Sequence, residues 1–216
     1  MQADKIARLR VTMEGIRPPI WRRLEVPIEF TFAQLSGVIL AAFGWSNYHL
    51  HEFEVGRRRI GMPDEDDWQA PVLSPEMLPA GVKIDPKLAD LFSSPPLEDE
   101  ATVRLASVLE SGVGRFVYRY DFGDDWQHLV RVEGLLPAQG DVTYPRCTAG
   151  RRSAPPEDCG GLPGYEHLLE VLADPAHGEY AELREWTPDF EPEEFDLAAA
   201  DRAVKDPRGF WDQLEE

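Results

Sequence analysis

Both cysteines and three of the five histidines are candidate ligands for a metal ion: His49, His51, His128, Cys147 and Cys159. Zinc accepts imidazole, thiolate and carboxylate groups in a tetrahedral shell, so these residue types suit it. His49 and His51 are two residues apart, and on a strand their imidazoles would project from one face. Eleven residues separate the cysteines, unlike the Cys-x-x-Cys knuckle, so a zinc site would depend on the tertiary fold. In the alternative, the histidines are hydrogen-bonded, the cysteines pack as small apolar side chains, and no cofactor is expected.

Cys159 lies in a segment of two prolines, two acids and two glycines, which can hold a side chain at a fixed position near a cleft. One hypothesis makes its thiol a nucleophile, with one of the three histidines as its base. The other gives the segment a structural role, in which Glu157 or Asp158 caps the following helix or pairs with Arg151 or Arg152. We favour the structural role.

Three aspartates, Asp121, Asp124 and Asp125, are candidates for acid–base chemistry or for magnesium binding. Aspartate in a turn also accepts a hydrogen bond from the backbone two residues on, so turn formation explains this cluster equally well. Asp121 with Phe122 and Gly123 matches the kinase magnesium motif by coincidence, because the accompanying glycine-rich loop, strand lysine and catalytic-loop asparagine are missing.

Aromatic residues accompany these acids along the chain, and recognition surfaces combine aromatic side chains with charged ones. The candidate binding residues are Trp21, Trp45, Tyr120, Asp121, Asp124, Trp126, Glu157 and Asp158.

Hydrophobic periodicity predicts the elements that must position these residues. Residues 32–43 form the clearest helix, with a capping box at Thr31 and Gln34 and a left-handed cap at Gly44. We expect strands at 5–13, 20–26, 49–55, 115–122 and 126–136, the last two forming a hairpin, and helices at 165–172, 180–186 and 193–205. Because Arg22 interrupts the apolar face of 20–26, we expect a partly exposed or edge strand there. Residues 62–96 read as a long excursion with one short helix.

The composition is that of a globular protein, and the predicted elements favour the α+β class. We expect a mostly antiparallel sheet packed against helices, with an acidic helical C-terminal part. The chain has 216 residues, is 43% hydrophobic and contains six tryptophans, so it can bury a core within one domain spanning residues 1–216, with the loop-rich excursion at 62–98. No apolar run is long enough to span a membrane and no signal segment is evident, so we expect a cytoplasmic protein.

A formal net charge of −18 disfavours binding to nucleic acid. The first 60 residues carry nine basic and six acidic residues, and we expect their arginine clusters, such as Arg22–Arg23, to be solvated. From residue 160 to the C-terminus there are four basic and 16 acidic residues, which predicts an acidic surface.

Four motifs carry a resemblance to a known family: residues 16–23 (IRPPIWRR), 43–45 with 49–53 (FGW, HLHEF), 118–128 (YRYDFGDDWQH) and 155–161 (PPEDCGG). In kind and order they resemble the plasmid pRi Orf-three-like family. The resemblance implies a compact α+β unit from a family that is widespread in bacteria and archaea, and it supplies no mechanism.

Some members of that family carry a label that links them to transposon resolvases. A recombinase needs an activated serine or tyrosine nucleophile and a basic DNA-binding region. Here the tail is acidic and no basic helix-turn-helix signal is present, so we do not expect recombinase activity.

These observations favour a non-enzymatic cytoplasmic binding module that recognises a basic peptide, a basic protein or a cation. We expect a protein or peptide partner ahead of nucleic acid, and no membrane. The alternative is a metal- or cysteine-dependent hydrolase that uses His49, His51, His128 and Cys159, with zinc as the metal.

Overall fold

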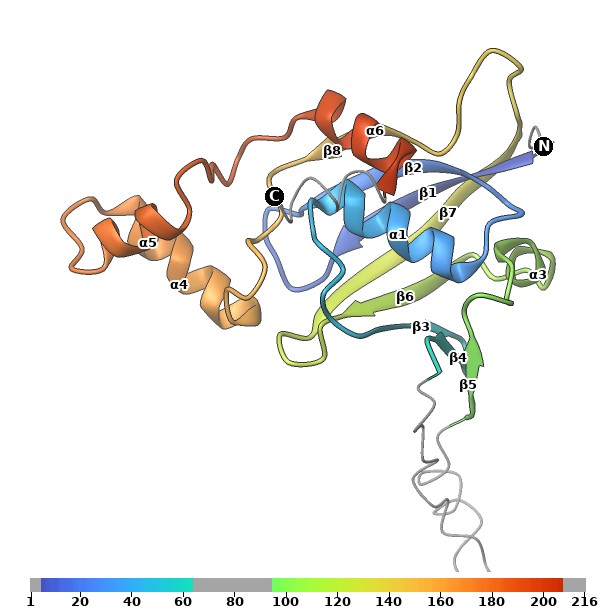
Figure 1. The fold of residues 1–216 in the computed structure, drawn as a ribbon, viewed down its shortest axis with the longest axis horizontal. Helices are drawn as coiled ribbons and strands as arrows, with labels where there is room; N and C mark the ends of the chain where they lie inside the picture. The colour runs from blue at the N-terminus through green and yellow to red at the C-terminus, as the bar shows by residue number, and fades with distance from the viewer. Residues whose placement is uncertain (1–4, 64–94, 208–216) are drawn as a thin grey trace, which may run out of the picture.

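One eight-stranded sheet forms the centre of the molecule (Figure 1). The structure is a computed structural model that describes residues 5–63 and 95–207. The strand order is β5-β4-β3-β6-β7-β1-β2-β8, and neighbours are antiparallel except β4 and β5. The strands are β1 (Lys5–Met13), β2 (Trp21–Pro27), β3 (His51–Val55), β4 (Arg58–Gly61), β5 (Leu97–Asp99), β6 (Arg115–Tyr120), β7 (Trp126–Pro137) and β8 (Arg146–Arg151). The expected α+β class with a mostly antiparallel sheet is confirmed.

Helices cover one face of this sheet, with a smaller group beside it. They are α1 (Phe32–Phe43), α3 (Leu105–Glu110), α4 (Gly161–Ala173), α5 (Tyr180–Trp186) and α6 (Leu197–Lys205). Figure 1 shows α1 and α6 in front of the sheet, where α6 packs on both α1 and β8, while α4 and α5 pack on each other to one side. None of the helices in the described ranges is long and apolar enough to cross a membrane.

The alternating pattern of β1 and the predicted helix α1 are both confirmed. Ala7, Leu9 and Val11 are fully buried beneath α1, and the residues between them are half exposed. In α1, Thr31 Oγ1 accepts a hydrogen bond from Gln34 N at 3.3 Å, and the Gln34 side chain accepts one from Thr31 N at 3.0 Å. A cap of this kind contributes about 1 kcal/mol. Ten of the twelve residues of α1 are buried, since the sheet covers one side of the helix and α6 covers another.

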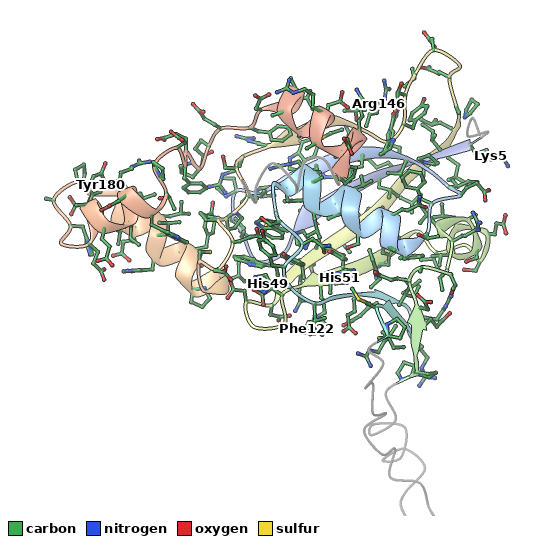
Figure 2. The ribbon with its side chains drawn as sticks, in the orientation of Figure 1. Lys5, His49, His51, Phe122, Arg146 and Tyr180 are labelled. Carbon is green, nitrogen blue, oxygen red and sulfur yellow. The ribbon has the colours of Figure 1, made fainter. Side chains whose placement is uncertain are left out.

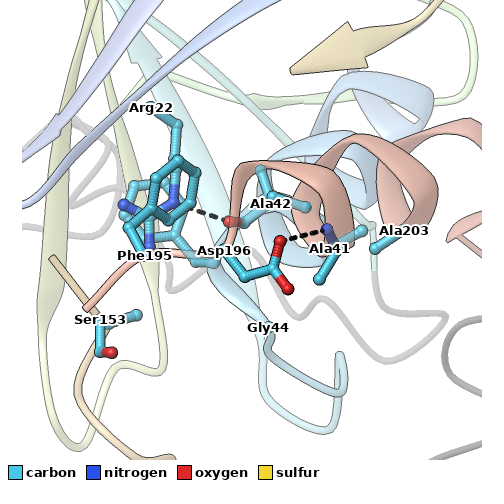
Figure 3. Close-up of a pocket in the computed structure, with 12 residues that line it drawn as sticks. Arg22, Ala41, Ala42, Gly44, Ser153, Phe195, Asp196 and Ala203 are labelled. Carbon is cyan, nitrogen blue, oxygen red and sulfur yellow. Dashed lines mark hydrogen bonds between the residues drawn. The ribbon is translucent and has the colours of Figure 1, made fainter. Parts of the chain in front are cut away.

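The prediction of an edge strand at residues 20–26 is wrong. β2 pairs with β1 and β8, and Arg22 is 2% exposed instead of solvated. Its guanidinium lies between the rings of Phe43 and Phe195, at 4.8 and 4.1 Å. It donates a hydrogen bond to the carbonyl of Ala42 (Figure 3), and others to the carbonyls of Trp21 and Arg151. The carbonyl of Ala42 belongs to the last turn of α1, where a positive charge is favourable. Arg22 thus ties two strands to the helix.

Several other strands and helices begin or end at residues that differ from the predicted ones. β3 begins at His51, so His49 precedes the strand and the two imidazoles do not share a strand face. β6 ends at Tyr120, α4 begins at Gly161 instead of 165, and α6 begins at Leu197 instead of 193. The short helix predicted within 62–96 falls largely outside the described residues.

Candidate functional site

Three segments that are distant in the sequence meet at one end of the sheet, beside the start of β3 (Figure 2). The first follows α1, where Gly44 adopts φ 80° and turns the chain away from the helix axis. Trp45 is then buried, donates a hydrogen bond from Nε1 to Pro155 O at 2.9 Å, and stacks on Tyr120 with ring centroids 5.2 Å apart. Trp45 therefore joins the end of α1 to the loop before α4 and to the end of β6.

Glu157 also connects these three segments through hydrogen bonds. Its carboxylate accepts hydrogen bonds from the Tyr120 hydroxyl at 2.6 Å and from Ser46 N at 2.8 Å. Burial, and then the nearby carboxylate of Glu157, raise the pKa of Tyr120 well above its usual range, so the phenol remains a donor. The expectation that Glu157 or Asp158 caps the next helix is wrong, because Gly160 is the N-cap of α4 and no side chain caps it.

The turn between β6 and β7 is built as turn chemistry predicts. Asp121 Oδ1 accepts hydrogen bonds from the backbone N–H groups of Gly123 and Asp124, at 2.9 and 3.3 Å. Asp124 in turn accepts a hydrogen bond from Gly160 N at 3.2 Å, and its backbone carbonyl packs directly on Gly161. The turn is thereby docked on the loop that precedes α4.

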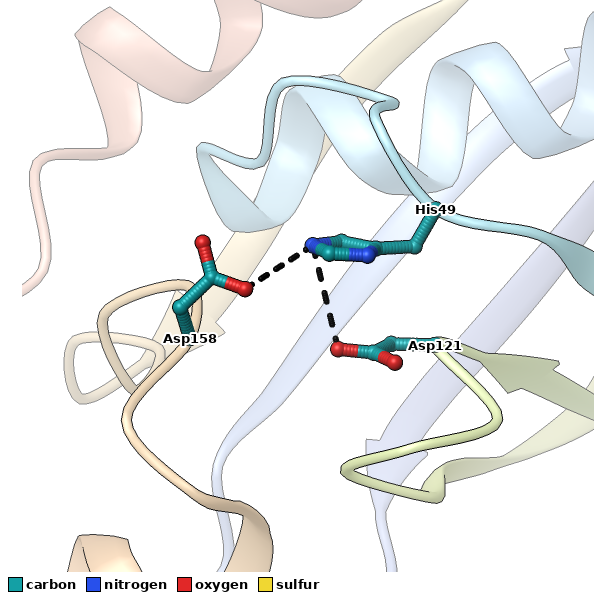
Figure 4. Close-up of side chains that lie close together, drawn as sticks. All are labelled: His49, Asp121 and Asp158. Atoms are coloured by element: carbon teal, nitrogen blue, oxygen red, sulfur yellow. Dashed lines mark ion pairs between the residues drawn. The ribbon is translucent and has the colours of Figure 1, made fainter.

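His49, Asp121 and Asp158 converge at the surface of this junction (Figure 4). His49 Nε2 is 3.1 Å from Asp158 Oδ1 and 3.8 Å from Asp121 Oδ2. One ligand atom from each residue lies within 4.8 Å of the other two. The side chains of His49 and Asp158 are 29% and 72% exposed, so the group is accessible from solvent. His49 Nε2 is itself buried, and no described group forms an aligned hydrogen bond with it.

Exposed apolar side chains adjoin this group along the chain, and the sequence analysis did not single them out. Tyr48 and Leu50 flank His49 in the chain and are 64% and 61% exposed, and Phe122, next to Asp121, is 46% exposed. Leu50 O accepts a hydrogen bond from Asp121 N at 2.9 Å, which holds the two segments side by side. The only sequence signals were that Leu50 and Phe122 lie within the HLHEF and YRYDFGDDWQH motifs and that Tyr48 immediately precedes HLHEF. We call these six residues, namely Tyr48, His49, Leu50, Asp121, Phe122 and Asp158, the junction site.

The other four predicted metal ligands lie apart from His49 in the described structure. His51 is buried, and its Nε2 is 2.8 Å from Glu100 Oε2. His128 is fully buried against the rings of Phe43 and Trp45. Within the described ranges, the group of side chains that could hold a metal ion contains His49 with two carboxylates and none of the other predicted ligands.

The two thiols have pKa values that oppose nucleophilic chemistry. Burial raises the pKa of Cys147 to about 11, and burial together with the charge of Asp124 raises that of Cys159 to about 12. The thiolate is the nucleophilic form of cysteine, so a raised pKa suppresses its reactivity at neutral pH. Arg152 pairs with Glu193 at 2.8 Å, not with either acid beside Cys159.

The predicted binding residues divide into three groups. Trp45, Tyr120 and Trp126 are buried and belong to the core. Trp21 is half exposed on the opposite face of the sheet, with the guanidinium of Arg10 over its ring at 4.0 Å. The acids Asp121, Asp124, Glu157 and Asp158 all lie at the junction.

Comparison with known proteins agrees with this architecture. The model of the family described as plasmid pRiA4b ORF-3-like protein matches residues 5–199. The chain belongs to this family. It is 33% identical over 208 residues to "Uncharacterized protein y4hQ" of Sinorhizobium fredii, covering 95% of this chain and 94% of that protein. The crystal structure titled "Protein of Unknown Function MM3350", from Methanosarcina mazei Go1, is 37% identical with a TM-score of 0.74, covering 91% of this chain and 98% of that one.

The motifs that carried the family resemblance are the segments that build the junction. Residues 43–53, 118–128 and 155–161 supply Trp45, His49, Tyr120 and Glu157. The first motif reaches the same region, because the guanidinium of Arg22 lies over the ring of Phe43, in the second motif, at 4.8 Å. In this member of the family, all four motifs therefore meet at one end of the sheet.

Proposed function

We propose that this protein is a non-enzymatic binding module that uses the junction site to recognise a lysine or arginine side chain of a protein or peptide partner. The observation that carries the proposal is the position of Asp121 and Asp158 on either side of His49, with exposed Tyr48, Leu50 and Phe122 next to them in the chain. Two carboxylates attract a cationic group, and an apolar rim excludes water from it.

The state of the cysteines supports binding over thiol chemistry. A cysteine nucleophile requires a lowered pKa, and both thiols have raised ones. The acidic character of the chain, with a net charge of −18, also favours the approach of a basic partner.

Titration with a fluorescein-labelled peptide of alternating arginine and leucine tests the proposal. Asp121→Asn and Asp158→Asn each remove one negative charge and leave the local backbone in place. Asparagine keeps the turn hydrogen bonds of Asp121 and tolerates the positive φ of 58° at Asp158. Asp174→Asn is the matched control, since Asp174 Oδ1 also accepts a turn hydrogen bond, from Ala176 N, away from the site.

Each site variant should weaken binding about five- to ten-fold, as expected for loss of a charged partner at a partly exposed pair, and the control should bind like the wild type. A peptide with glutamine at every arginine position should not bind. Equal affinity of all three variants would refute the proposal.

A divalent metal is the second candidate for the same site. His49 Nε2 has no aligned hydrogen-bond partner, and three suitable ligand atoms lie within 4.8 Å of one another. Zinc accepts this donor set, and three protein ligands would leave a position for water, as the hydrolase hypothesis requires.

Elemental analysis of protein purified without chelator separates the two candidates. Zinc bound near one equivalent in the wild type and lost in His49→Ala would favour the metal. His167→Ala is the control, because His167 Nε2 also lies 3.1 Å from a carboxylate, that of Glu179. If the wild type contains no metal and binds the arginine peptide, the binding module is the one candidate of the two that remains.

A further inference from the structure

The face of the sheet opposite α1 carries an excess of positive charge within an acidic protein. In the six adjacent strands β3, β6, β7, β1, β2 and β8, side chains on this open face include eight arginines and four glutamates. The arginines are Arg8, Arg10, Arg23, Arg115, Arg119, Arg131, Arg146 and Arg151, and the glutamates are Glu25, Glu52, Glu54 and Glu133. These strand positions therefore hold four positive charges in excess, or three when Asp125 of the adjoining turn, which pairs with Arg119 at 2.9 Å, is counted, whereas the whole chain has a net charge of −18.

Strand register aligns four of these arginines in a row. Arg115 of β6 is opposite Arg131 of β7, Arg131 is opposite Arg10 of β1, and Arg10 is opposite Arg23 of β2. Neighbouring strands are about 4.8 Å apart, so the row crosses the sheet over about 14 Å. Like charges directly opposite each other destabilise a sheet. This arginine row is thus an unfavourable arrangement for the isolated molecule.

Neutralisation of the row from within the described chain is incomplete. Arg23 pairs with Glu133 at 2.6 Å, and Arg10 lies over the ring of Trp21. Arg115 and Arg131 are exposed and form no ion pair with any described residue. A hollow of about 580 Å³ lies against these two arginines, lined also by residues 56, 113, 114 and 132. Among the residues that the structure describes, the row therefore ends in two guanidinium groups without an ion-pair partner, beside an accessible hollow.

An apolar stripe runs parallel to the arginine row. Two positions further along the strands, Val117 is opposite Leu129, and Thr12 is opposite both Leu129 and Trp21. Val117, Leu129 and Trp21 are each half exposed, so no described element covers them.

This combination fits an acidic protein segment better than nucleic acid. Bases bind by stacking on free aromatic rings, but Trp21 already has Arg10 over it and the rest of the stripe is aliphatic or small. The glutamates on the face would also repel a phosphate backbone, whereas a protein segment can place a donor beside each of them.

We propose that the open face of the sheet is a docking surface for an acidic protein segment that presents carboxylates to the arginine row and apolar side chains to the adjoining stripe. The surface is separate from the junction site, and its test does not depend on the proposed function. Arginine suits the role, because its planar guanidinium can bind a carboxylate through two parallel hydrogen bonds.

The experiment measures binding of a fluorescein-labelled peptide of alternating glutamate and valine by fluorescence anisotropy. The test protein is the double variant Arg115→Gln/Arg131→Gln. Its control is Arg17→Gln/Arg202→Gln, which removes the same charge from exposed positions outside the open face. The wild type should bind the peptide, and binding should weaken as salt rises. The double variant should bind about ten-fold more weakly, and the control should bind like the wild type.

Two further measurements separate structural from functional effects. The double variant should unfold at the same temperature as the wild type or a higher one, because it removes like-charge repulsion. A peptide of alternating glutamate and serine should bind more weakly than the valine peptide if the apolar stripe takes part.

Three results would overturn the proposal. If the control variant bound the peptide as weakly as the double variant, the loss of affinity would come from net charge and not from the arginine row. Tighter binding of an oligothymidine, lost in the same double variant, would make the face a nucleic-acid surface. Self-association of the wild type that the double variant abolishes, seen by sedimentation velocity, would make a second copy the occupant.

Discussion

The substitution His128→Leu should make the protein resistant to a loss of stability that the wild type undergoes in mild acid. His128 is fully buried against aromatic rings, and neither ring nitrogen has an aligned hydrogen-bond partner. Burial, reinforced by the charge of Arg22, lowers the pKa of the imidazole from 6.5 to about 4. The folded protein therefore holds His128 neutral where an unfolded chain would bind a proton.

The sign and size of the effect follow from this difference in pKa. The contribution is fully present above about pH 6.5 and is lost progressively as the pH falls towards 4, because only the unfolded state takes up the proton in that window. Between pH 7 and pH 5, the free energy of unfolding of the wild type should fall by about 2 kcal/mol on account of His128.

Leucine has a similar volume and does not titrate. At pH 7, His128→Leu should lie within about 1.5 kcal/mol of the wild type, because the change roughly conserves volume and leaves no described hydrogen-bond partner unpaired. At pH 5 the variant should gain about 2 kcal/mol relative to the wild type.

Urea unfolding at pH 7, 6 and 5, followed by tryptophan fluorescence, measures this difference. Contributions that are common to both proteins cancel in the difference. His167→Leu is the control, since it makes the same replacement at a side chain that is 52% exposed. A difference between wild type and His128→Leu that is the same at pH 7 and pH 5 would refute the reasoning.

Three further predictions concern the junction. Tyr120→Phe removes the hydrogen bond to the Glu157 carboxylate and should lower the free energy of unfolding by about 2 kcal/mol, measured by urea titration; an unchanged midpoint would mean that the bond is not formed. Cys159, with its pKa raised to about 12, should react with an aromatic disulfide reagent at pH 8 at least about ten-fold more slowly than in unfolded protein, and equal rates would contradict its burial. Gly161→Ala would bring a Cβ within 2.6 Å of Asp124 O at a φ of 66°, so it should destabilise the protein by about 2 kcal/mol or more in thermal unfolding. A folded Gly161→Ala protein of unchanged stability would show that the turn is not docked on the loop.

Elements with local signals could be predicted from the sequence. The capping box at the start of α1 and the left-handed glycine at its end mark both ends of the helix, and β1 alternates between buried and half-exposed residues from Ala7 to Met13. The hairpin of β6 and β7 follows from an aspartate-rich turn between two alternating runs. Each of these signals lies within the element that it predicts.

Features that depend on tertiary contacts could not be predicted. The burial of Arg22 depends on a helix end and on Phe195, which is 173 positions away in the chain. The arginine row exists only because three strand pairings share one register, and no single strand shows it.

The candidate site was predicted in part. His49, Asp121 and Asp158 were each named as candidates from residue type. The spacing of His49 and His51 suggested that both lie on one strand, but that strand begins at His51 and His49 lies with the two aspartates. The exposed rim of Tyr48, Leu50 and Phe122 could not be distinguished from core residues, because aromatic and aliphatic side chains carry no mark of exposure.

The position of Phe195 has a consequence for anyone who shortens this chain. The ring covers the guanidinium of Arg22, and Gly150 leaves room for it, since a Cβ there would lie 2.4 Å from the ring. Asp201 of α6 likewise accepts a hydrogen bond from Cys147 N at 3.0 Å. An expression boundary placed after α5 would therefore remove the cover from a buried cation and a hydrogen-bond partner from the edge strand β8. Residues 195–204 should be kept in any shortened version, however much they resemble a dispensable acidic tail.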